Sequence, residues 1–245
     1  MVIHPVFFWI EAFFLLGAVG TVLANRKSTS SAIKERWLKL IIHFIIVNLL
    51  LLLIIYLNEF TVPVMLLILL IGLFELGKYI NNKKLLFYAV AVLVYVVFSV
   101  GFLLMIKTFP INALIFVFLI VFVFDGFSQI SGQLLGKHKL FPDTSPGKTW
   151  EGFAGGALFG LITGIMTRNW LNIGISEAIY SVFILILAAT MGDWLASFYK
   201  RRNSIKDFSK LIPGHGGVLD RFDSWITAGG VIYMLHLLNL FSFIN

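Results

Sequence analysis

The chain has 245 residues, of which 59% are hydrophobic, 16% aromatic and 13% charged, and it contains no cysteine. Soluble domains average about 45–50% apolar and about 25% charged residues, so this composition excludes an ordinary soluble domain. A mean hydropathy of +0.95 also excludes disorder, because such a chain buries enough apolar surface to offset the entropy of ordering. The lack of cysteine excludes disulfides, thiolate zinc sites and cysteine nucleophiles, so any chemistry must use oxygen ligands, histidine, lysine or arginine.

Apolar stretches long enough to cross a bilayer recur along nearly the whole chain. A transmembrane helix needs about 20 mostly apolar residues. The sequence therefore predicts an all-α, polytopic membrane protein with about eight transmembrane helices. They are expected at residues 3–24, 38–57, 61–80, 85–106, 111–131, 152–167, 176–199 and 225–243. Totals of seven or nine stay open, because the stretch at 152–167 is short and rich in glycine.

The loops between these stretches alternate in charge. Lysines and arginines gather in every second loop, and of the 19 in the chain only Lys107 and Arg168 fall in the opposite loops. Because cytoplasmic loops carry the basic excess, we expect a multi-pass protein of the cell (inner) membrane, with these loops in the cytoplasm and both termini outside. The net charge of +7 then reflects topology and attraction to lipid headgroups, and no nucleic-acid partner is expected.

Two of the basic loops, residues 136–151 and 200–224, are longer and more polar than simple connectors. The second combines basic residues, acids and glycines with almost no helical period. Glycines let backbone N–H groups approach an anion, lysines and arginines neutralise it, and carboxylates hold Mg²⁺ through oxygen. Since functional residues gather on loops held by a rigid scaffold, these two cytoplasmic loops are predicted to form a site for phosphate and metal.

Acids within or near the apolar stretches are further candidates, because a charge at membrane depth is costly. Asp193 and Asp125 lie near the cytoplasmic ends of two stretches. We expect a functional role for both, with a carboxylate paired to a nearby lysine as the alternative. Glu75 lies one helical turn from Lys78, and pairing within the helix or an interfacial position is expected for it.

The earlier loop enters the sixth stretch through Ser145, Lys148 and Thr149. Serine or threonine is expected to cap that helix, whose N-terminus would offer an anion site beside Lys148; a plain helix cap is the alternative. The Gly-Lys-Thr triplet is not a P-loop, because Pro142 stands where that motif needs glycine. His215 has no second ligand at metal spacing, so a hydrogen bond to phosphate or bracing of the loop is expected.

The run of residues 197–223 resembles the signature of the phosphatidate cytidylyltransferases, also called CDP-diacylglycerol synthases. It reads Ser197-x-x-Lys200-Arg201-x4-Lys206-Asp207-x5-Pro213-Gly214-His215-Gly216-Gly217-x-x-Asp220-Arg221-x-Asp223. Two more segments are similar to motifs of that family, Ser145-Pro146-x-Lys148-Thr149-Trp150-Glu151-Gly152 and Gly192-Asp193. The resemblance covers roughly residues 120–225, whereas the first hundred residues resemble the family only as apolar spans.

This resemblance implies an enzyme that joins CTP to a lipid phosphate, with phosphatidic acid as the first acceptor to consider, giving CDP-lipid and pyrophosphate with Mg²⁺. The metal-binding aspartates of the family map onto Asp193 and Asp220, with Asp223 close by, and its basic residues onto Lys200, Arg201, Lys206 and Arg221. Substrate-binding roles are expected for Ser145, Lys148, Thr149, Ser197, Asp207, His215, Gly216, Gly217 and Asp125. The resemblance also implies a homodimer, and a potassium ion has been associated with the metal site of the family.

The chain is expected to be a single membrane domain, 1–245, with N-terminal spans (1–110), a catalytic core (111–225) and a last span (225–245). One stretch departs from the family. Where Asp-Thr-x-Ala-Tyr and then Gly-Arg are usual, this chain has Asp125-Gly126-Phe127-Ser128-Gln129, with Gln133 after Gly132. The missing guanidinium puts the identity of the lipid acceptor in question and fits a divergent paralogue. A CTP-dependent lipid or polyprenol kinase and a transporter are the alternative functions.

Overall fold

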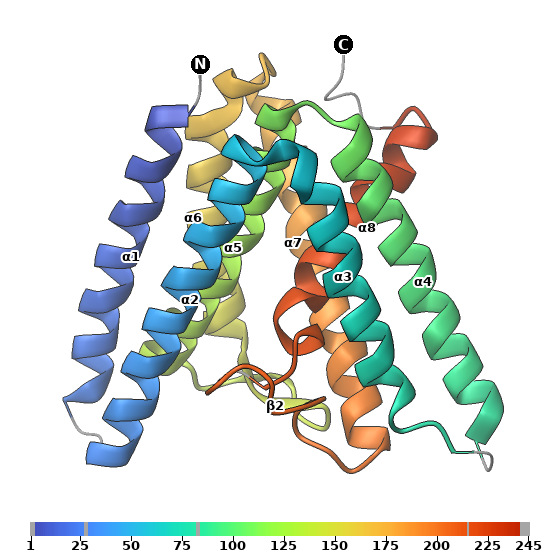
Figure 1. The fold of residues 1–245 in the computed structure, drawn as a ribbon. Coiled ribbons are helices and arrows are strands. Elements are labelled where there is room, and N and C mark those ends of the chain that lie inside the picture. The colour runs from blue at the N-terminus through green and yellow to red at the C-terminus, as the bar shows by residue number, and fades with distance from the viewer. Residues whose placement is uncertain (1–2, 27–28, 82–83, 215, 241–245) are drawn as a thin grey trace. The chain divides into compact units, whose positions relative to one another are not determined.

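The computed structural model of the chain describes residues 3–26, 29–81, 84–214 and 216–240 (Figure 1). The described residues form eight α-helices, a short 3₁₀ helix and a two-stranded sheet. Their bounds are α1 Ile3–Asn25, α2 Ser30–Tyr56, α3 Asn58–Gly77, α4 Leu85–Thr108, α5 Ile111–Leu135, β1 Lys139–Phe141, β2 Ser145–Thr149, α6 Trp150–Thr167, η2 Arg168–Trp170, α7 Ile175–Arg202 and α8 Leu219–Leu237.

The elements divide into two compact units. Unit 1 consists of Met1–Tyr56 and Ile111–Ile186, and unit 2 of Leu57–Pro110 and Leu187–Asn245. Unit 1 therefore holds α1, α2, α5, the sheet, α6 and the first part of α7. Unit 2 holds α3, α4, the rest of α7 and α8. The single membrane domain stays a prediction.

Every predicted apolar stretch overlaps a helix among the described residues, and six of these helices are long and apolar enough to cross a membrane. The six are α1, α2, α3, α4, α5 and α7. The other two, α6 and α8, are less apolar than these six, for reasons visible in their sequences. Glycine recurs throughout α6, and α8 carries Asp220, Arg221 and Asp223 in its first turns. The polytopic membrane protein is thus confirmed, with six candidate spans among the described residues rather than eight.

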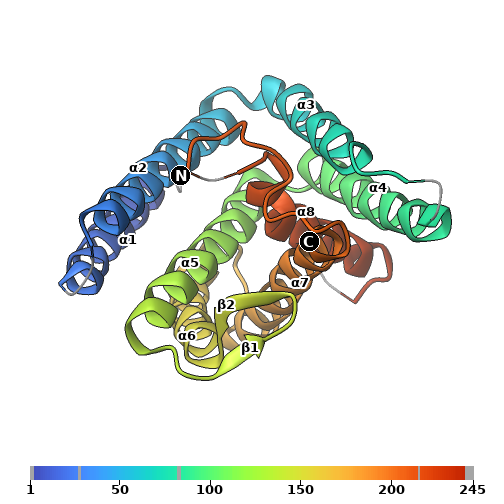
Figure 2. The same ribbon diagram turned by 90° about the horizontal axis from the view of Figure 1, so that it is seen from below.

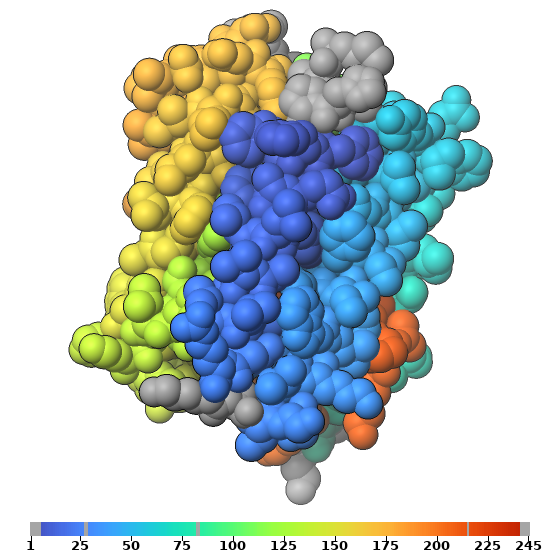
Figure 3. Space-filling model, turned by 90° about the vertical axis from the view of Figure 1, so that its left-hand side faces the viewer, coloured from blue at the N-terminus to red at the C-terminus, as the bar shows by residue number. Residues whose placement is uncertain are grey.

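Large apolar side chains cover the outer surfaces of the long helices. Phe8 and Leu15 of α1 are 70% and 69% exposed, and Leu86 of α4 is 79% exposed. Figure 3 shows α1 and α2 side by side over one face of unit 1. Apolar surface of this extent is costly in water and suits a lipid environment.

The core of unit 1 is α5, which is buried on all sides from Ala113 to Phe124. It packs against α6, where Gly152, Gly156, Gly160 and Gly164 recur every fourth residue along the buried face. A Cβ at Gly152 would lie 2.7 Å from the carbonyl oxygen of Ser128 in α5. Small residues at this spacing let two helix backbones approach closely, so the glycines that make α6 a weak apolar span also dock it.

Unit 2 is built on the pairs α3–α4 and α4–α8, which Figure 2 shows from below. The backbones of α4 and α8 meet at Gly101 and Gly230, where a Cβ on Gly101 would lie 3.0 Å from the Cα of Gly230. Phe102 of α4 packs edge-on against Trp225 of α8, with ring centroids 5.1 Å apart. These contacts hold the N-terminal turns of α8 in place, and those turns carry the acids of the signature.

The all-α prediction holds only in part, because the loop after α5 folds into a β-hairpin. Lys139 pairs with Thr149 and Phe141 with Ser145, in antiparallel register. The Glu151 carboxylate accepts hydrogen bonds from the backbone N–H groups of Lys137 and His138, at 3.0 and 3.2 Å. This carboxylate ties the start of the hairpin to the first turn of α6, a link that apolar periodicity does not reveal.

Candidate active site

The signature segment is less of a loop than the sequence indicated, because both of its ends are helical. Lys200 and Arg201 belong to the last turn of α7, which continues to Arg202. Asp220 belongs to the first turn of α8, which begins at Leu219. The predicted loop of residues 200–224 is therefore wrong at both ends. The basic end of α7 and the acidic start of α8 each complement the dipole of their helix.

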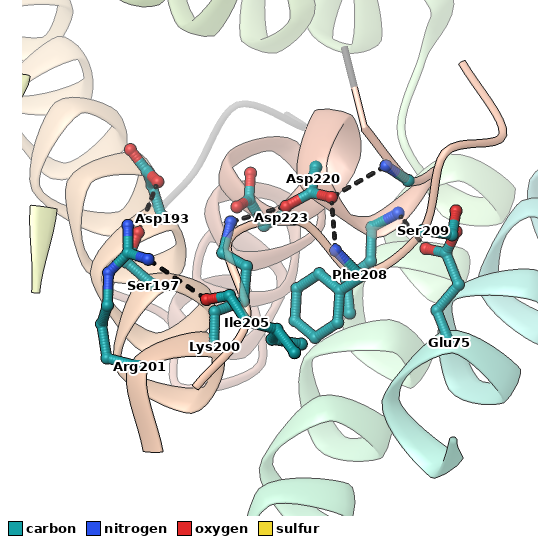
Figure 4. A network of polar contacts seen from close by, with 12 residues as sticks. Glu75, Asp193, Ser197, Lys200, Arg201, Ile205, Phe208, Ser209, Asp220 and Asp223 are labelled. Carbon is teal, nitrogen blue, oxygen red and sulfur yellow. Dashed lines mark hydrogen bonds and ion pairs between the residues drawn. The ribbon is translucent and has the colours of Figure 1, made fainter. Parts of the chain in front are cut away.

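Asp220 lies at the centre of a buried polar network in unit 2 (Figure 4). Its Oδ1 accepts a hydrogen bond from Lys200 Nζ at 2.5 Å, and its Oδ2 accepts the backbone N–H groups of Phe208 and Gly217, both at 2.8 Å. Lys200 and Asp220 are only 9% and 8% exposed. The Lys200 ammonium also lies 5.4 Å from the centre of the Phe208 ring. One carboxylate thus fastens α7, the connecting loop and α8 together.

The glycines of the signature give the loop room to reach this carboxylate. Gly216 has a φ of +82°, and a Cβ there would lie 2.7 Å from Asp220 Oδ2 and 3.2 Å from Asp207 Oδ1. Ile212 and Gly216 form an isolated antiparallel bridge, with N···O distances of 2.8 and 3.1 Å. At this position glycine meets both requirements, a left-handed backbone and close approach to an acid.

Glu75 of α3 forms the second anchor of the network, and the sequence reasoning missed it. Its side chain is 1% exposed, and it accepts hydrogen bonds from Ser209 Oγ at 2.5 Å, from Val218 N at 3.1 Å and from Leu219 N at 2.8 Å. It therefore caps the N-terminus of α8, where Val218 supplies no side-chain cap of its own.

The expected pairing of Glu75 with Lys78 is wrong, because the Glu75 carboxylate binds Ser209, Val218 and Leu219 instead. Lys78 Nζ instead lies 4.9 Å from the centre of the Phe74 ring. The cost of an acid at membrane depth, which points to a role for Asp193, is also the signal in the sequence that points to Glu75. Because Lys78 lies one helical turn from Glu75, the sequence suggests a local pair and does not indicate the contacts of Glu75 with Ser209, Val218 and Leu219.

Tyrosine hydroxyls add two more links, one to α3 and one to the residues that directly follow it. Tyr199 of α7 donates to the carbonyl oxygen of Leu76 at 2.6 Å, and Tyr79 donates to the carbonyl oxygen of Phe208 at 3.0 Å. Because these bonds join backbone that is far apart in sequence, α3 acts as the support on which the signature segment is fixed.

Asp193 and Asp223 approach the network from α7 and α8. Asp193 is half-buried and accepts a hydrogen bond from Ser197 Oγ at 3.4 Å, whereas Asp223 is 8% exposed. The two helices touch between them, since a Cβ on Gly192 would lie 2.5 Å from the carbonyl oxygen of Asp223. Figure 4 shows these two acids in the same region as Asp220.

The donor set suits a magnesium ion that shares its ligands with a substrate. The described residues contain no group of three or more histidines and acids able to enclose a metal by themselves. Mg²⁺ usually takes one or two carboxylates together with substrate phosphates, so two neighbouring aspartates are sufficient. Asp220 already accepts three donors, which leaves about one of the roughly four lone-pair positions of a carboxylate.

The remaining charged residues of the signature lie at the surface of unit 2. Arg201, Lys206, Asp207 and Arg221 are exposed. Arg201 donates to the carbonyl oxygen of Ile205 at 3.1 Å, which holds its guanidinium over the start of the loop. Exposed cations beside a rigid buried network can reach an anion from solution. His215 lies outside the described residues.

The other predicted binding residues belong to unit 1. Thr149 is the N-cap of α6, and its Oγ1 accepts the backbone N–H of Gly152 at 3.1 Å, which confirms the predicted cap. Ser145, Lys148 and Asp125 are half-buried in the hairpin and near the end of α5. Their binding roles stay predictions.

Next to this cap, the backbone N–H of Lys137 and further hydrogen bonds lower the pKa of the Glu151 carboxyl to about 2. The imidazole ring of His138 contributes to this lowering through a contact of 2.5 Å between His138 Nδ1 and Glu151 Oε1. Glu151 is therefore ionised at any physiological pH, and its carboxylate can hold the hairpin against α6 throughout that range.

Comparison with known proteins places these residues among related sequences. A sequence profile described as "Cytidylyltransferase family" matches residues 2–239. The phosphatidate cytidylyltransferase of Staphylococcus saprophyticus is 36% identical over 146 residues, which cover 58% of this chain and 54% of the relative. Those of Staphylococcus haemolyticus and Haemophilus influenzae are 39% identical over 132 residues and 40% over 121, covering 53% and 47% of this chain and 48% and 42% of the relatives. The chain thus spans about half the length of the curated relatives it matches.

Proposed function

The chain belongs to the cytidylyltransferase family, and on this premise we propose that it transfers a cytidylyl group from CTP to the phosphate of a membrane lipid, releasing pyrophosphate. Phosphatidic acid is the acceptor to test first, since relatives at 36–40% identity are named phosphatidate cytidylyltransferases. The observation that carries the proposal is the Lys200–Asp220 network, which folds the signature into a rigid support for exposed cations and for two aspartates suited to a metal.

The chemistry of the proposed reaction demands charge neutralisation more than proton transfer. A phosphate monoester has a second pKa of about 6, so the lipid phosphate is largely dianionic at pH 7 and attacks without a general base. Its oxygen forms a bond to the α-phosphorus of CTP while the bond to pyrophosphate breaks. Both reactants are anions, so the barrier falls when cations neutralise the transferring group and the leaving group.

We assign these tasks to the residues of unit 2. Lys200, Arg201, Lys206 and Arg221 are proposed to bind phosphate groups, with Lys200 also positioned by Asp220. Asp193, Asp220 and Asp223 are the proposed ligands of Mg²⁺, and a potassium ion is proposed as a second ion at this site. When bound, Mg²⁺ would supply Lewis-acid stabilisation of phosphoryl oxygens and a template for in-line attack. Ser197 would hold Asp193 in position through its hydrogen bond.

The wider setting of the reaction is also a proposal. The basic loops are proposed to face the cytoplasm, with both termini outside, so that CTP arrives from water while the acyl chains stay in the bilayer. A homodimer follows from the family resemblance. Ser145, Lys148, Thr149 and Asp125 remain proposed substrate-binding residues in unit 1, with Asp207, Gly216, Gly217 and His215 in unit 2.

The experiment that tests this function uses purified protein in lipid nanodiscs, CTP and Mg²⁺. CTP labelled at the α-phosphate and CTP labelled at the γ-phosphate are each offered with phosphatidic acid and with a panel of other lipid phosphates, including a polyprenyl phosphate and free polyprenol. Cytidylyl transfer puts α-label into lipid and releases pyrophosphate. Transfer of γ-label would show a kinase instead, and absence of both with every lipid would overturn the proposal. The panel also tests whether the altered stretch at Asp125–Gln133 goes with a different acceptor.

A further inference from the structure

A cavity of about 240 Å³ lies within unit 2, bounded by α3, α4, α7 and α8. Its walls are almost entirely apolar and include Phe87, Val94 and Phe98 of α4 and Leu195 of α7. An apolar chamber of this kind has no use for CTP, which is polar and highly charged. Its presence beside a proposed site for a lipid phosphate therefore calls for a different ligand.

The two tyrosines in the wall contribute rings rather than free hydroxyl groups. Tyr95 Oη donates to the carbonyl oxygen of Leu69 at 2.8 Å, and Tyr199 Oη donates to the carbonyl oxygen of Leu76 at 2.6 Å. Both hydroxyls are thus satisfied by the backbone of α3. The aromatic faces that remain offer dispersion contacts and no specific polar contact, which suits a hydrocarbon chain.

The cavity adjoins the polar network directly. Leu219 and Phe208 line it with their side chains, while their backbone N–H groups donate to Glu75 and Asp220. Asp223, a proposed metal ligand, is also a lining residue. One end of a hydrocarbon chain in the cavity would therefore lie beside Asp223 and next to Leu219, the residue before Asp220. Both aspartates are proposed metal ligands.

The wall on the α4 side reaches the outer surface of the unit. Val90 lines the cavity and is 51% exposed, and its neighbours on α4, Leu86 and Leu93, are 79% and 62% exposed. These apolar side chains belong to a candidate membrane span. With α4 in a bilayer, these side chains would connect the hydrocarbon of the lipid with the apolar wall of the cavity.

We propose that this cavity is the subsite for one acyl chain of the lipid phosphate substrate, with the phosphate held at the network and the chain lying between α4 and α7. The inference rests on the proposed function for the nature of the headgroup. Lipid tails are as apolar as the cavity wall, so burial alone gives no preference over bulk lipid. Selection comes from the headgroup, because only a lipid with an accessible phosphate can fill the cavity and reach the cations together.

The test is photolabelling, which does not depend on turnover. The protein is placed in phosphatidylcholine nanodiscs with a phosphatidic acid that carries an alkyl diazirine on one chain, and labelled peptides are mapped by mass spectrometry. A phosphatidylcholine with the same diazirine chain is the matched probe. We expect labelling of α4 and α7 to be about tenfold higher with the phosphatidic acid probe, as one tenfold step corresponds to about 1.4 kcal/mol of preference.

A pair of variants locates the label. Ala91→Phe fills the cavity from α4, since Ala91 lines it, whereas Ala89→Phe adds the same ring at an exposed position that does not line it. Ala91→Phe should remove most of the preferential labelling, and Ala89→Phe should leave it unchanged. Equal labelling by the two probes, or labelling that survives Ala91→Phe in folded protein, would overturn the acyl-chain assignment. If the wild-type protein shows the expected labelling pattern but no CTP-dependent transfer, the proposed reaction is refuted and the lipid subsite is retained.

Discussion

Replacing Glu75 by glutamine should release the start of α8 while changing the shape of the side chain very little. Glu75 Oε1 accepts Ser209 Oγ and Val218 N, and Oε2 accepts Leu219 N. A glutamine has only one acceptor oxygen, so its NH₂ group must face at least one of these donors. Loss of a charge-assisted hydrogen bond, an unsatisfied N–H and a weaker interaction with the helix dipole together cost about 2–4 kcal/mol.

Hydrogen–deuterium exchange of the segment around Val218 and Leu219, followed by mass spectrometry in detergent, measures this loosening directly. If the whole cost appears in local opening, exchange should accelerate by about 30-fold to 1,000-fold. The rest of α8, which packs on α4 through Gly230, should change much less. The proposed CDP-lipid formation should fall as well, because Asp220 would lose its fixed position.

Glu59→Gln is the matched control, since Glu59 lies in the first turn of the same helix and is exposed. This variant should exchange like the wild type. If Glu75→Gln leaves the exchange of the Val218–Leu219 segment unchanged, or if both variants accelerate it equally, the capping role derived from the hydrogen bonds is refuted.

Three further experiments probe the same geometry and that of the hairpin. Asp220→Asn should lower the free energy of unfolding in detergent by about 3–5 kcal/mol, because it leaves the Lys200 ammonium buried without its partner. Adding Lys200→Met to this variant should restore most of the lost stability but no transfer activity. Gly216→Ala should cost about 1–3 kcal/mol in unfolding experiments because of its positive φ and the nearby Asp220 carboxylate, whereas Gly147→Ala, with open space around it, should be near neutral. The Glu151 carboxyl should titrate near pH 2 in a ¹³C NMR titration, because hydrogen bonds lower its pKa from 4.5 to about 2 in the folded protein. Ionised Glu151 therefore stabilises the hairpin at pH values above 4.5, and this stability is lost as the pH falls through about 2. A midpoint above 4 would contradict the hydrogen bonds seen at this carboxylate.

The helices and one cap follow from local sequence, because hydrophobic period and capping chemistry act over a few residues. The predicted stretch 111–131 lies within α5, and Thr149 caps α6 as its sequence indicated. The ends of α7 and α8 were misjudged for a related reason. Charged residues weakened the apolar signal in the turns that carry Lys200 and Asp220, although helix dipoles favour those charges there.

The partners of the site residues could not be predicted, because they are set by packing between distant segments. Lys200 and Asp220 are both in the signature, but nothing in their spacing shows that one neutralises the other. Glu75 meets Leu219 across 144 residues of sequence. Contacts of this kind depend on which helices pack together, and the pairing of α3 with α4 and of α4 with α8 leaves no local trace.

The cap that Glu75 places on α8 has a consequence for how this protein can be recombined with its relatives. The first hundred residues look interchangeable, because they consist mostly of apolar helices, yet the Glu75 side chain completes the support of the signature segment. A chimera that exchanges this N-terminal portion is therefore compatible only if the donor brings an acid to the position of Glu75. Compatibility of the two portions therefore depends on this carboxylate as well as on the hydrophobicity of the exchanged helices.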